Sequence, residues 1–185
     1  MKKNFDFVGL VDVLSLKNNV IQLNDKIWEE HQFRQKAAKT HKKTKTIELM
    51  WDLDSLNSLE KGTITKNFKL LDIPNFLKKI KNFYELKYGN GEFVRVLIVK
   101  LEKKSKITPH VDSGIGLIMA KRTHIPIITN ANVIFIVGGE EKNMKEGEIW
   151  EIDNQSVHSV ENNSHIDRIH LIIDYLPSVL KKGLI

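Results

Sequence analysis

The sequence predicts an α+β protein that is mainly β: a double-stranded β-helix (jelly roll, cupin-like) with N-terminal helices packed on one face. After Gly91 the chain alternates short apolar segments with turns rich in Gly and Asn, a pattern typical of antiparallel double sheets. Before Gly91 it carries its helix-forming segments. Helices that precede such a sheet in the chain commonly pack together on one of its faces.

A single domain over residues 1–185 is expected, because this length suits one hydrophobic core and no linker or internal repeat interrupts it. Residues 1–92 would form the N-terminal helical and strand support. Residues 93–176 would form the jelly-roll core.

The first part of the chain predicts a helix and a strand. Residues 4–23 fit either one irregular helix or short strands. From Asp25 the segment DKIWEEHQFRQKAA begins acidic and ends basic, which favours a helix. His31 and Arg34 on this helix are expected to face solvent rather than line a substrate rim. The apolar, β-compatible run at 47–51 predicts a strand that flanks the core.

A second helix is predicted in LDIPNFLKKIKNFYELKYGNG. Asp72 is its candidate N-cap, Pro74 lies in the first turn and Gly89 follows its last periodic residue. Apolar residues spaced by threes and fours form a stripe that indicates core packing: Phe76, Leu77, Ile80, Phe83, Tyr84 and Tyr88.

The rest of the chain alternates strands with turns. The predicted strands are 93–101, 107–112, 122–129, 132–138, 147–153, 157–162 and 167–175.

Composition excludes several classes of function. There is no cysteine, so disulfides, thiolate metal ligands and a cysteine nucleophile are unavailable, and a cytoplasmic location is expected. Asp6 and Asp12 interrupt any signal-peptide core, and no apolar run is long enough to span a membrane. The net charge of +6 comes mostly from lysines, clustered at 36–46 and 78–82. The first cluster lacks interleaved aromatic residues, so a solvated face is preferred over a nucleic-acid surface.

His110, Asp112 and His158 are the candidate metal ligands. His110 and Asp112 lie two residues apart, so on a strand their side chains leave the same face. Folding of the sheet could bring His158 opposite the pair. Two imidazoles and one carboxylate leave coordination positions open, the arrangement of non-haem Fe(II) oxygenases. Zinc is the main alternative metal.

Arg168 begins the apolar segment RIHLIIDY, ten residues after His158. A guanidinium stays charged when partly buried and can grip a carboxylate with two parallel hydrogen bonds. Arg168 is therefore the candidate for binding the distal carboxylate of 2-oxoglutarate.

These motifs carry a family resemblance. PHVD, RTHIPI, the GEIWEIDN segment followed by His158, and DRIHLIIDY together resemble the aspartyl/asparaginyl β-hydroxylases, which are Fe(II)- and 2-oxoglutarate-dependent oxygenases, over roughly 107–176. The resemblance implies that His110, Asp112 and His158 bind iron and that Arg168 binds the co-substrate. It also implies that Arg122 and His124, which share one face of a strand, contact the carboxylate of co-substrate or substrate. Some family members lack the acidic ligand, whereas Asp112 places this chain with the three-ligand members.

Other polar residues near these motifs receive less specific interpretations. His170 is expected to be a hydrogen-bonded core histidine, and His165 is expected to face solvent. Trp150 and Asn154 could line the pocket or simply pack and turn the chain.

The expected function is that of an Fe(II)/2-oxoglutarate-dependent dioxygenase using O2 to hydroxylate an unactivated C–H of a carboxylate-bearing substrate, such as an amino acid. The alternatives are hydroxylation of an Asp or Asn side chain in a peptide or protein, and a jelly roll that binds metal without turnover. A cupin-type dioxygenase is a nearer rival but leaves Arg168 without a role. A nucleic-acid-binding protein is the remaining rival class.

Overall fold

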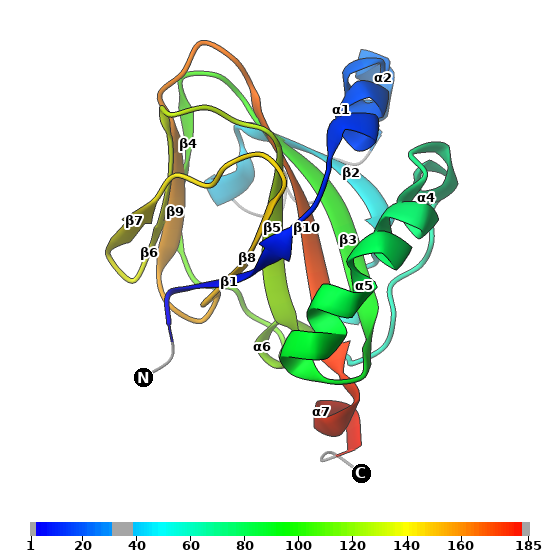
Figure 1. The fold of residues 1–185 in the computed structure, drawn as a ribbon. Coiled ribbons are helices and arrows are strands. Elements are labelled where there is room, and N and C mark those ends of the chain that lie inside the picture. The colour runs from blue at the N-terminus through cyan, green and yellow to red at the C-terminus, as the bar shows by residue number, and fades with distance from the viewer. Residues whose placement is uncertain (1–2, 31–38, 183–185) are drawn as a thin grey trace.

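Two antiparallel sheets lie side by side in the molecule (Figure 1). The computed structural model describes residues 3–30 and 39–182, so His31 and Arg34 lie outside the described residues. Ten strands make up the sheets: β1 (Phe5–Leu10), β2 (Thr44–Met50), β3 (Gly91–Leu101), β4 (Ser105–His110), β5 (Lys121–Ile128), β6 (Val133–Val137), β7 (Glu140–Lys142), β8 (Glu148–Ile152), β9 (His158–Asn162) and β10 (Arg168–Pro177).

The larger sheet has six strands in the order β1-β8-β5-β10-β3-β2, and the smaller has four in the order β4-β9-β6-β7. The seven strands predicted after Gly91 correspond to β3, β4, β5, β6, β8, β9 and β10, with ends shifted by at most two residues. The predicted double-stranded β-helix is confirmed. The short strand β7 was not predicted. Residues 4–23, which fitted either one irregular helix or short strands, contain a strand, β1, as well as a helix.

The α-helices are α1 (Leu14–Ile21), α2 (Asp25–Glu29), α4 (Lys66–Leu70), α5 (Ile73–Tyr88), α6 (Ile115–Met119) and α7 (Ser178–Lys182), and the 3-10 helices are η1 (Lys39–His41) and η2 (Asp54–Leu56). In Figure 1, α1, α2, α4 and α5 all lie on the side of the large sheet away from the small one. None of the helices in the described parts of the chain is both long and apolar enough to cross a membrane.

Side chains that alternate along the strands contribute to two separate apolar layers. Ile169, Leu171 and Ile173 of β10 belong to the largest core cluster, together with residues of α1, α4 and α5. A second cluster, which includes Phe135 of β6 and Val160 of β9, belongs to the small sheet and the strands beside it. Successive residues of a strand point to opposite faces, so the even-numbered residues of β10 turn toward the space between the sheets.

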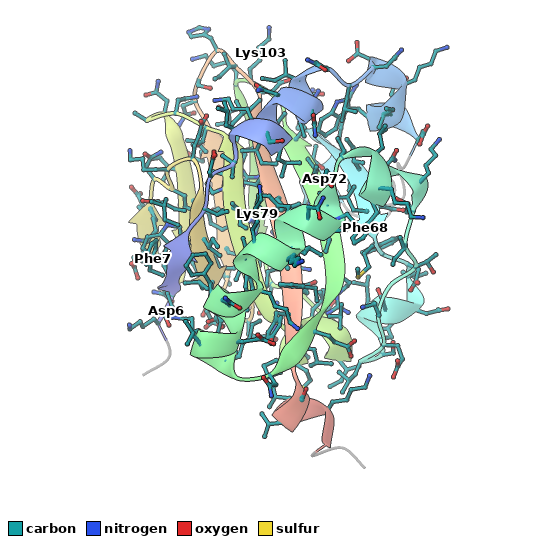
Figure 2. The ribbon with its side chains drawn as sticks, turned by 45° about the vertical axis from the view of Figure 1, so that its right-hand side comes forward. Asp6, Phe7, Phe68, Asp72, Lys79 and Lys103 are labelled. Carbon is teal, nitrogen blue, oxygen red and sulfur yellow. The ribbon has the colours of Figure 1, made fainter. Side chains whose placement is uncertain are left out.

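The helix α5 lies across the large sheet, as Figure 2 shows, with Asp72 and Lys79 on its outer side. The predicted apolar stripe is buried or partly buried against the core. Asp72 occupies the N-cap position in a left-handed conformation (φ 54°), but its carboxylate accepts from the Asn75 side chain instead of a backbone N–H. Pro74 in the first turn and Gly89 (φ 79°) at the end bound the helix as predicted.

Replacing Ile80 by Ala should lower the free energy of unfolding by about 2–5 kcal/mol, because Ile80 is fully buried between α5 and the sheet. Leu86 on the same helix is 87% exposed, so Leu86→Ala should change stability by no more than about 0.5 kcal/mol. Urea unfolding of both variants tests this. Equal effects would show that α5 does not pack on the sheet through this stripe.

Candidate metal centre and its cavity

Two neighbouring strands bring the three predicted metal ligands together. His110 at the end of β4 pairs in register with His158 at the start of β9, and Asp112 follows two residues after His110. One donor atom from each of these three side chains lies within 4.8 Å of the others. The pairing of β4 with β9 thus brings together Asp112 and His158, which are 46 residues apart in the sequence.

Each histidine is oriented by a backbone carbonyl two residues before it. The Nδ1 atom of His110 lies 2.8 Å from the Thr108 carbonyl oxygen, and Nδ1 of His158 lies 3.0 Å from that of Ser156. A carbonyl can only accept, so each ring donates its Nδ1–H and keeps a lone pair on Nε2. Burial lowers the pKa of His158, although the negative charge of Asp112 acts in the opposite direction. Its ring is therefore neutral and able to bind a metal at pH 7.

Asp112 is held through both its side chain and its backbone. Arg122 donates to Oδ2 of Asp112 at 2.6 Å, and the backbone N–H of Asp112 donates to the Asn154 carbonyl at 3.1 Å. Burial alone would raise the pKa of Asp112, but the positive charge of Arg122 lowers it overall. The site therefore offers one charged oxygen donor and two imidazole nitrogen donors. This donor set fits Fe(II) with open coordination positions.

A cavity opens beside these donors, and its walls combine polar and apolar side chains. It is lined by His41, Val99, Ile107, His110, Asp112, Arg122, His124, Phe135, His158, Val160, Arg168 and Ile172. All six residues predicted to bind the metal or the co-substrate are among them.

Arg168 is a buried cation without an acidic partner in the described part of the chain. It is 1% exposed, and its Nη2 donates to Nδ1 of His170 at 2.6 Å, while its Nε–H has no partner. Burial lowers the pKa of Arg168 to about 9, so the group is still charged at neutral pH. A buried, unneutralised guanidinium favours an anion in the cavity, and its planar fork suits a carboxylate. The site thus also fits 2-oxoglutarate.

His170 is buried and hydrogen-bonded, as predicted. Burial and the adjacent charge of Arg168 hold its pKa well below the usual value. The neutral ring can therefore accept from Arg168 at Nδ1.

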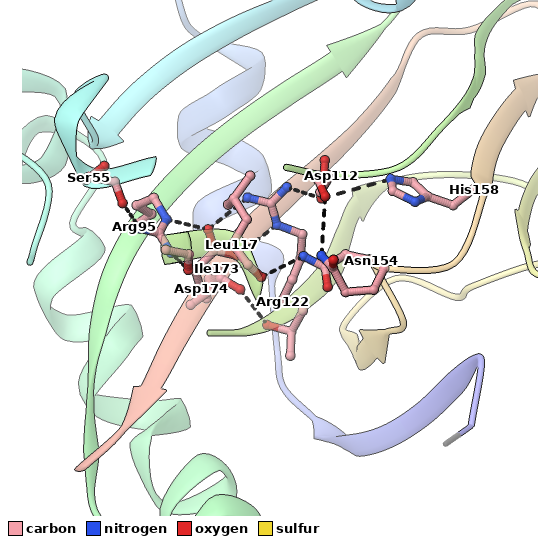
Figure 3. Close-up of polar contacts among 12 residues, drawn as sticks. Ser55, Arg95, Asp112, Leu117, Arg122, Asn154, His158, Ile173 and Asp174 are labelled. Carbon is pink, nitrogen blue, oxygen red and sulfur yellow. Dashed lines mark hydrogen bonds and ion pairs between the residues drawn. The ribbon is translucent and has the colours of Figure 1, made fainter. Parts of the chain in front are cut away.

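Arg122 and His124 both line the cavity from β5. Arg122 donates through Nε and Nη2 to both oxygens of Asp174 at 2.8 Å, in addition to its bond with Asp112 (Figure 3). The His124 ring lies edge-on to Phe135, with 4.9 Å between ring centroids. The same cavity therefore holds His124 and a guanidinium that is already shared between two carboxylates.

Sequence reasoning missed His41, Arg95 and Asp174. His41 lies in the lysine-rich segment assigned to solvent, yet its ring stands edge-on to His110 at 5.4 Å. Arg95 and Asp174 each interrupt an apolar strand, which is a usable signal for a buried ion pair. Asn154, left open from the sequence, is buried and donates to the Leu117 carbonyl. His165 is exposed, as expected.

Comparisons with known proteins agree with this geometry. A family model described as aspartyl/asparaginyl β-hydroxylase matches residues 15–177. No curated protein matches the chain.

Several solved structures share the fold. One is an oxidoreductase of the 2OG-Fe(II) oxygenase family from Burkholderia pseudomallei, with TM-score 0.60 and 17% identity over 74% of this chain and 70% of that one. A non-heme monooxygenase described as a ThoJ-Ni complex has TM-score 0.58 and 12% identity over 94% and 74% of the two chains. The viral collagen prolyl hydroxylase of Paramecium Bursaria Chlorella virus-1, in a 2OG complex, has TM-score 0.54 and 8% identity over 94% and 95%.

The family match extends over most of the chain and includes every motif on which the resemblance rests. One cavity brings together the three candidate metal donors and the buried cation Arg168. The chain belongs to the aspartyl/asparaginyl β-hydroxylase family and is a 2-oxoglutarate-dependent hydroxylase.

Proposed function

We propose that this protein hydroxylates an unactivated C–H bond of a carboxylate-bearing substrate such as an amino acid. His110, Asp112 and His158 would hold Fe(II), and Arg168 would bind the distal carboxylate of 2-oxoglutarate. One observation carries the proposal: a buried guanidinium with no acidic partner in the described residues lines the same cavity as three converging metal donors.

Iron with 2-oxoglutarate and O2 supplies the oxidant for hydroxylation and yields succinate and CO2. The chain's own residues prepare the site for this chemistry. The two imidazoles present Nε2 lone pairs because their Nδ1–H groups are bound to backbone carbonyls. The cavity walls include the apolar side chains of Val99 and Ile172, which would limit the access of water.

His170 would support co-substrate binding through Arg168. By accepting from Nη2, it restricts the rotation of the guanidinium and leaves Nε–H and further N–H groups for a carboxylate. Less conformational entropy is then lost when the carboxylate binds.

Arg122 and His124 would contact a carboxylate of the co-substrate or of the substrate. Arg122 has five N–H groups. Three of these donate to Asp112 and Asp174, which leaves two N–H groups that could donate to a carboxylate. His124 adds a polar ring in the same cavity. These groups support a substrate that carries a carboxylate. An Asp or Asn side chain in a peptide is the alternative substrate.

Replacing His110, Asp112 or His158 by Ala should weaken Co(II) or Fe(II) binding by at least about 100-fold and abolish turnover, because each removes one of three donors. Anaerobic calorimetric titration measures the affinity, and circular dichroism checks that the fold is intact. His165→Ala is the control, since this histidine is exposed in a turn. Full turnover in any two of the three ligand variants would contradict the assignment.

Arg168→Lys should raise the 2-oxoglutarate concentration needed for half-maximal turnover roughly 10- to 100-fold, equivalent to one charge-assisted hydrogen bond of about 1.5–3 kcal/mol. Lysine keeps the charge but lacks the fork. Metal affinity should change little. Lys103→Ala removes an exposed charge (Figure 2) and serves as the control. An unchanged requirement for 2-oxoglutarate would refute the role of Arg168 and point to Arg122 instead.

Free amino acids should support coupled turnover better than the same residues within blocked peptides, because a free carboxylate can bind Arg122 or His124. Succinate release matched to a product mass gain of one oxygen measures coupling for each candidate. Hydroxylation only of peptides that lack a free carboxylate would establish the peptide alternative.

A further inference from the structure

Four side chains of alternating charge run from the large sheet to the metal centre: Arg95, Asp174 and Arg122 are buried, and Asp112, itself a candidate donor, is partly buried (Figure 3). Arg95 of β3 donates through Nε to Asp174 Oδ2 at 2.8 Å. Asp174 of β10 accepts two bonds from Arg122, also at 2.8 Å. The Nη1 atom of Arg122 then donates to Oδ2 of Asp112 at 2.6 Å. We refer to these four residues as the charge chain.

Strand register creates this alternation. Asp174 lies opposite Arg95 across the β3–β10 pair and opposite Arg122 across the β5–β10 pair. Its exposed fraction is 2%, and its two oxygens are occupied by the two arginines. Neither Asp174 nor Arg95 lines the cavity. These two residues therefore do not contact a bound metal and would act on it indirectly, in the case of Asp174 through its two bonds with Arg122.

The charge chain also holds the segment that follows Asp112. The two terminal nitrogens of Arg95 donate to the backbone carbonyls of Ser55 in η2 and Gly116 in α6. Gly116 leaves no space for a side chain, because an added Cβ would collide with Ser55 and Ser58 backbone oxygens. The backbone on the C-terminal side of Asp112 is thus fixed by the same guanidinium that binds Asp174.

Charge balance explains why Asp174 matters to the metal. The pKa of Asp174 would rise on burial alone, but Arg122 and Arg95 lower it, so it stays ionised. It then shares the positive charge of Arg122 with Asp112. Without the charge of Asp174, Asp112 would be the main counterion of Arg122. A stronger bond from Arg122 would draw Asp112 Oδ2 toward the guanidinium and compete with a metal for the carboxylate.

We infer that Asp174 is a positioning residue for the metal centre: it holds Arg122 in a two-bond fork so that Asp112 is presented to the metal in one orientation. The inference rests on the proposed role of Asp112 as a ligand. Ligand-orienting groups of this kind commonly affect metal affinity 10- to 100-fold, which is the order of the effect expected here.

The test is anaerobic Co(II) titration of Asp174→Asn, which keeps the shape and removes the charge. We expect about 10- to 100-fold weaker Co(II) binding and an altered Co(II) absorption spectrum. Asp52→Asn is the matched control, because Asp52 accepts from Ser55 and Thr63 near η2 but belongs to no contact of the metal donors. It should lower the melting temperature without changing Co(II) affinity or spectrum.

A double-mutant cycle separates positioning from general destabilisation. In an Asp112→Ala background, adding Asp174→Asn should cause no further loss of Co(II) affinity, since the path runs through Asp112. An equal loss in both backgrounds would overturn the inference, as would unchanged affinity in Asp174→Asn alone. If Asp174→Asn does not fold, Arg122→Lys replaces it. This variant keeps the charge but cannot bind both carboxylates through a fork, so the same weakening is expected and unchanged affinity overturns the inference.

The cobalt measurement needs neither 2-oxoglutarate nor turnover. Wild-type protein that binds Co(II) through His110 and His158 but hydroxylates nothing would refute the proposed reaction alone. A Co(II) affinity in Asp174→Asn equal to that of wild type would refute the positioning role alone.

Discussion

The pairing of β10 between β3 and β5 is the constraint on which both the core and the site depend. Every residue of this strand is buried, so neither of its faces can tolerate a change of register. Ile169, Leu171 and Ile173 enter the core under the helices, while Arg168 and Asp174 enter the opposite side. A shift by one residue would exchange the two faces and bury charge in the apolar core. The helices therefore help to stabilise the site by stabilising this register.

Three arginines in the described part of the chain are buried, and they differ in whether an acidic side chain neutralises them. Arg95 and Arg122 are neutralised by Asp174, with Asp112 as a second partner of Arg122. Among the residues that the structure describes, the hydrogen-bond partner of the Arg168 side chain is a neutral imidazole. Because an isolated buried charge is costly, the binding of an anion beside Arg168 would relieve a cost already present in the folded protein. Arg95 and Arg122 instead contribute rigidity at Asp112.

The two donor histidines and the guanidinium groups come from different sheets. The histidines lie on adjacent strands of the small sheet and are oriented by carbonyls only two residues away in the chain. The guanidinium groups of Arg122 and Arg168 come from the large sheet and reach the cavity from the other side. The site is complete only when the two sheets are packed together. A defect in that packing would therefore separate the groups expected to bind metal from those expected to bind the co-substrate.

The sequence by itself determined the strands after Gly91 other than β7 and the helix α5, because each leaves a local pattern of periodicity. It also indicated the three candidate metal donors and Arg168, through the identity and spacing of the motif residues. The predicted family followed from the same motifs and is confirmed by the match over 15–177. The strand predicted at 47–51 corresponds to β2, which lies at one edge of the large sheet as expected. Only the tertiary structure decided that β1 forms the other edge, that His41 reaches the cavity, and that Asp174 joins Arg95 to Arg122. Asp174 lies 79 residues from Arg95 and 52 from Arg122. A charged residue within an apolar strand is a signal of a buried ion pair, but its partner depends on cross-strand register, which is set by burial of whole strands and cannot be read from one segment of the chain.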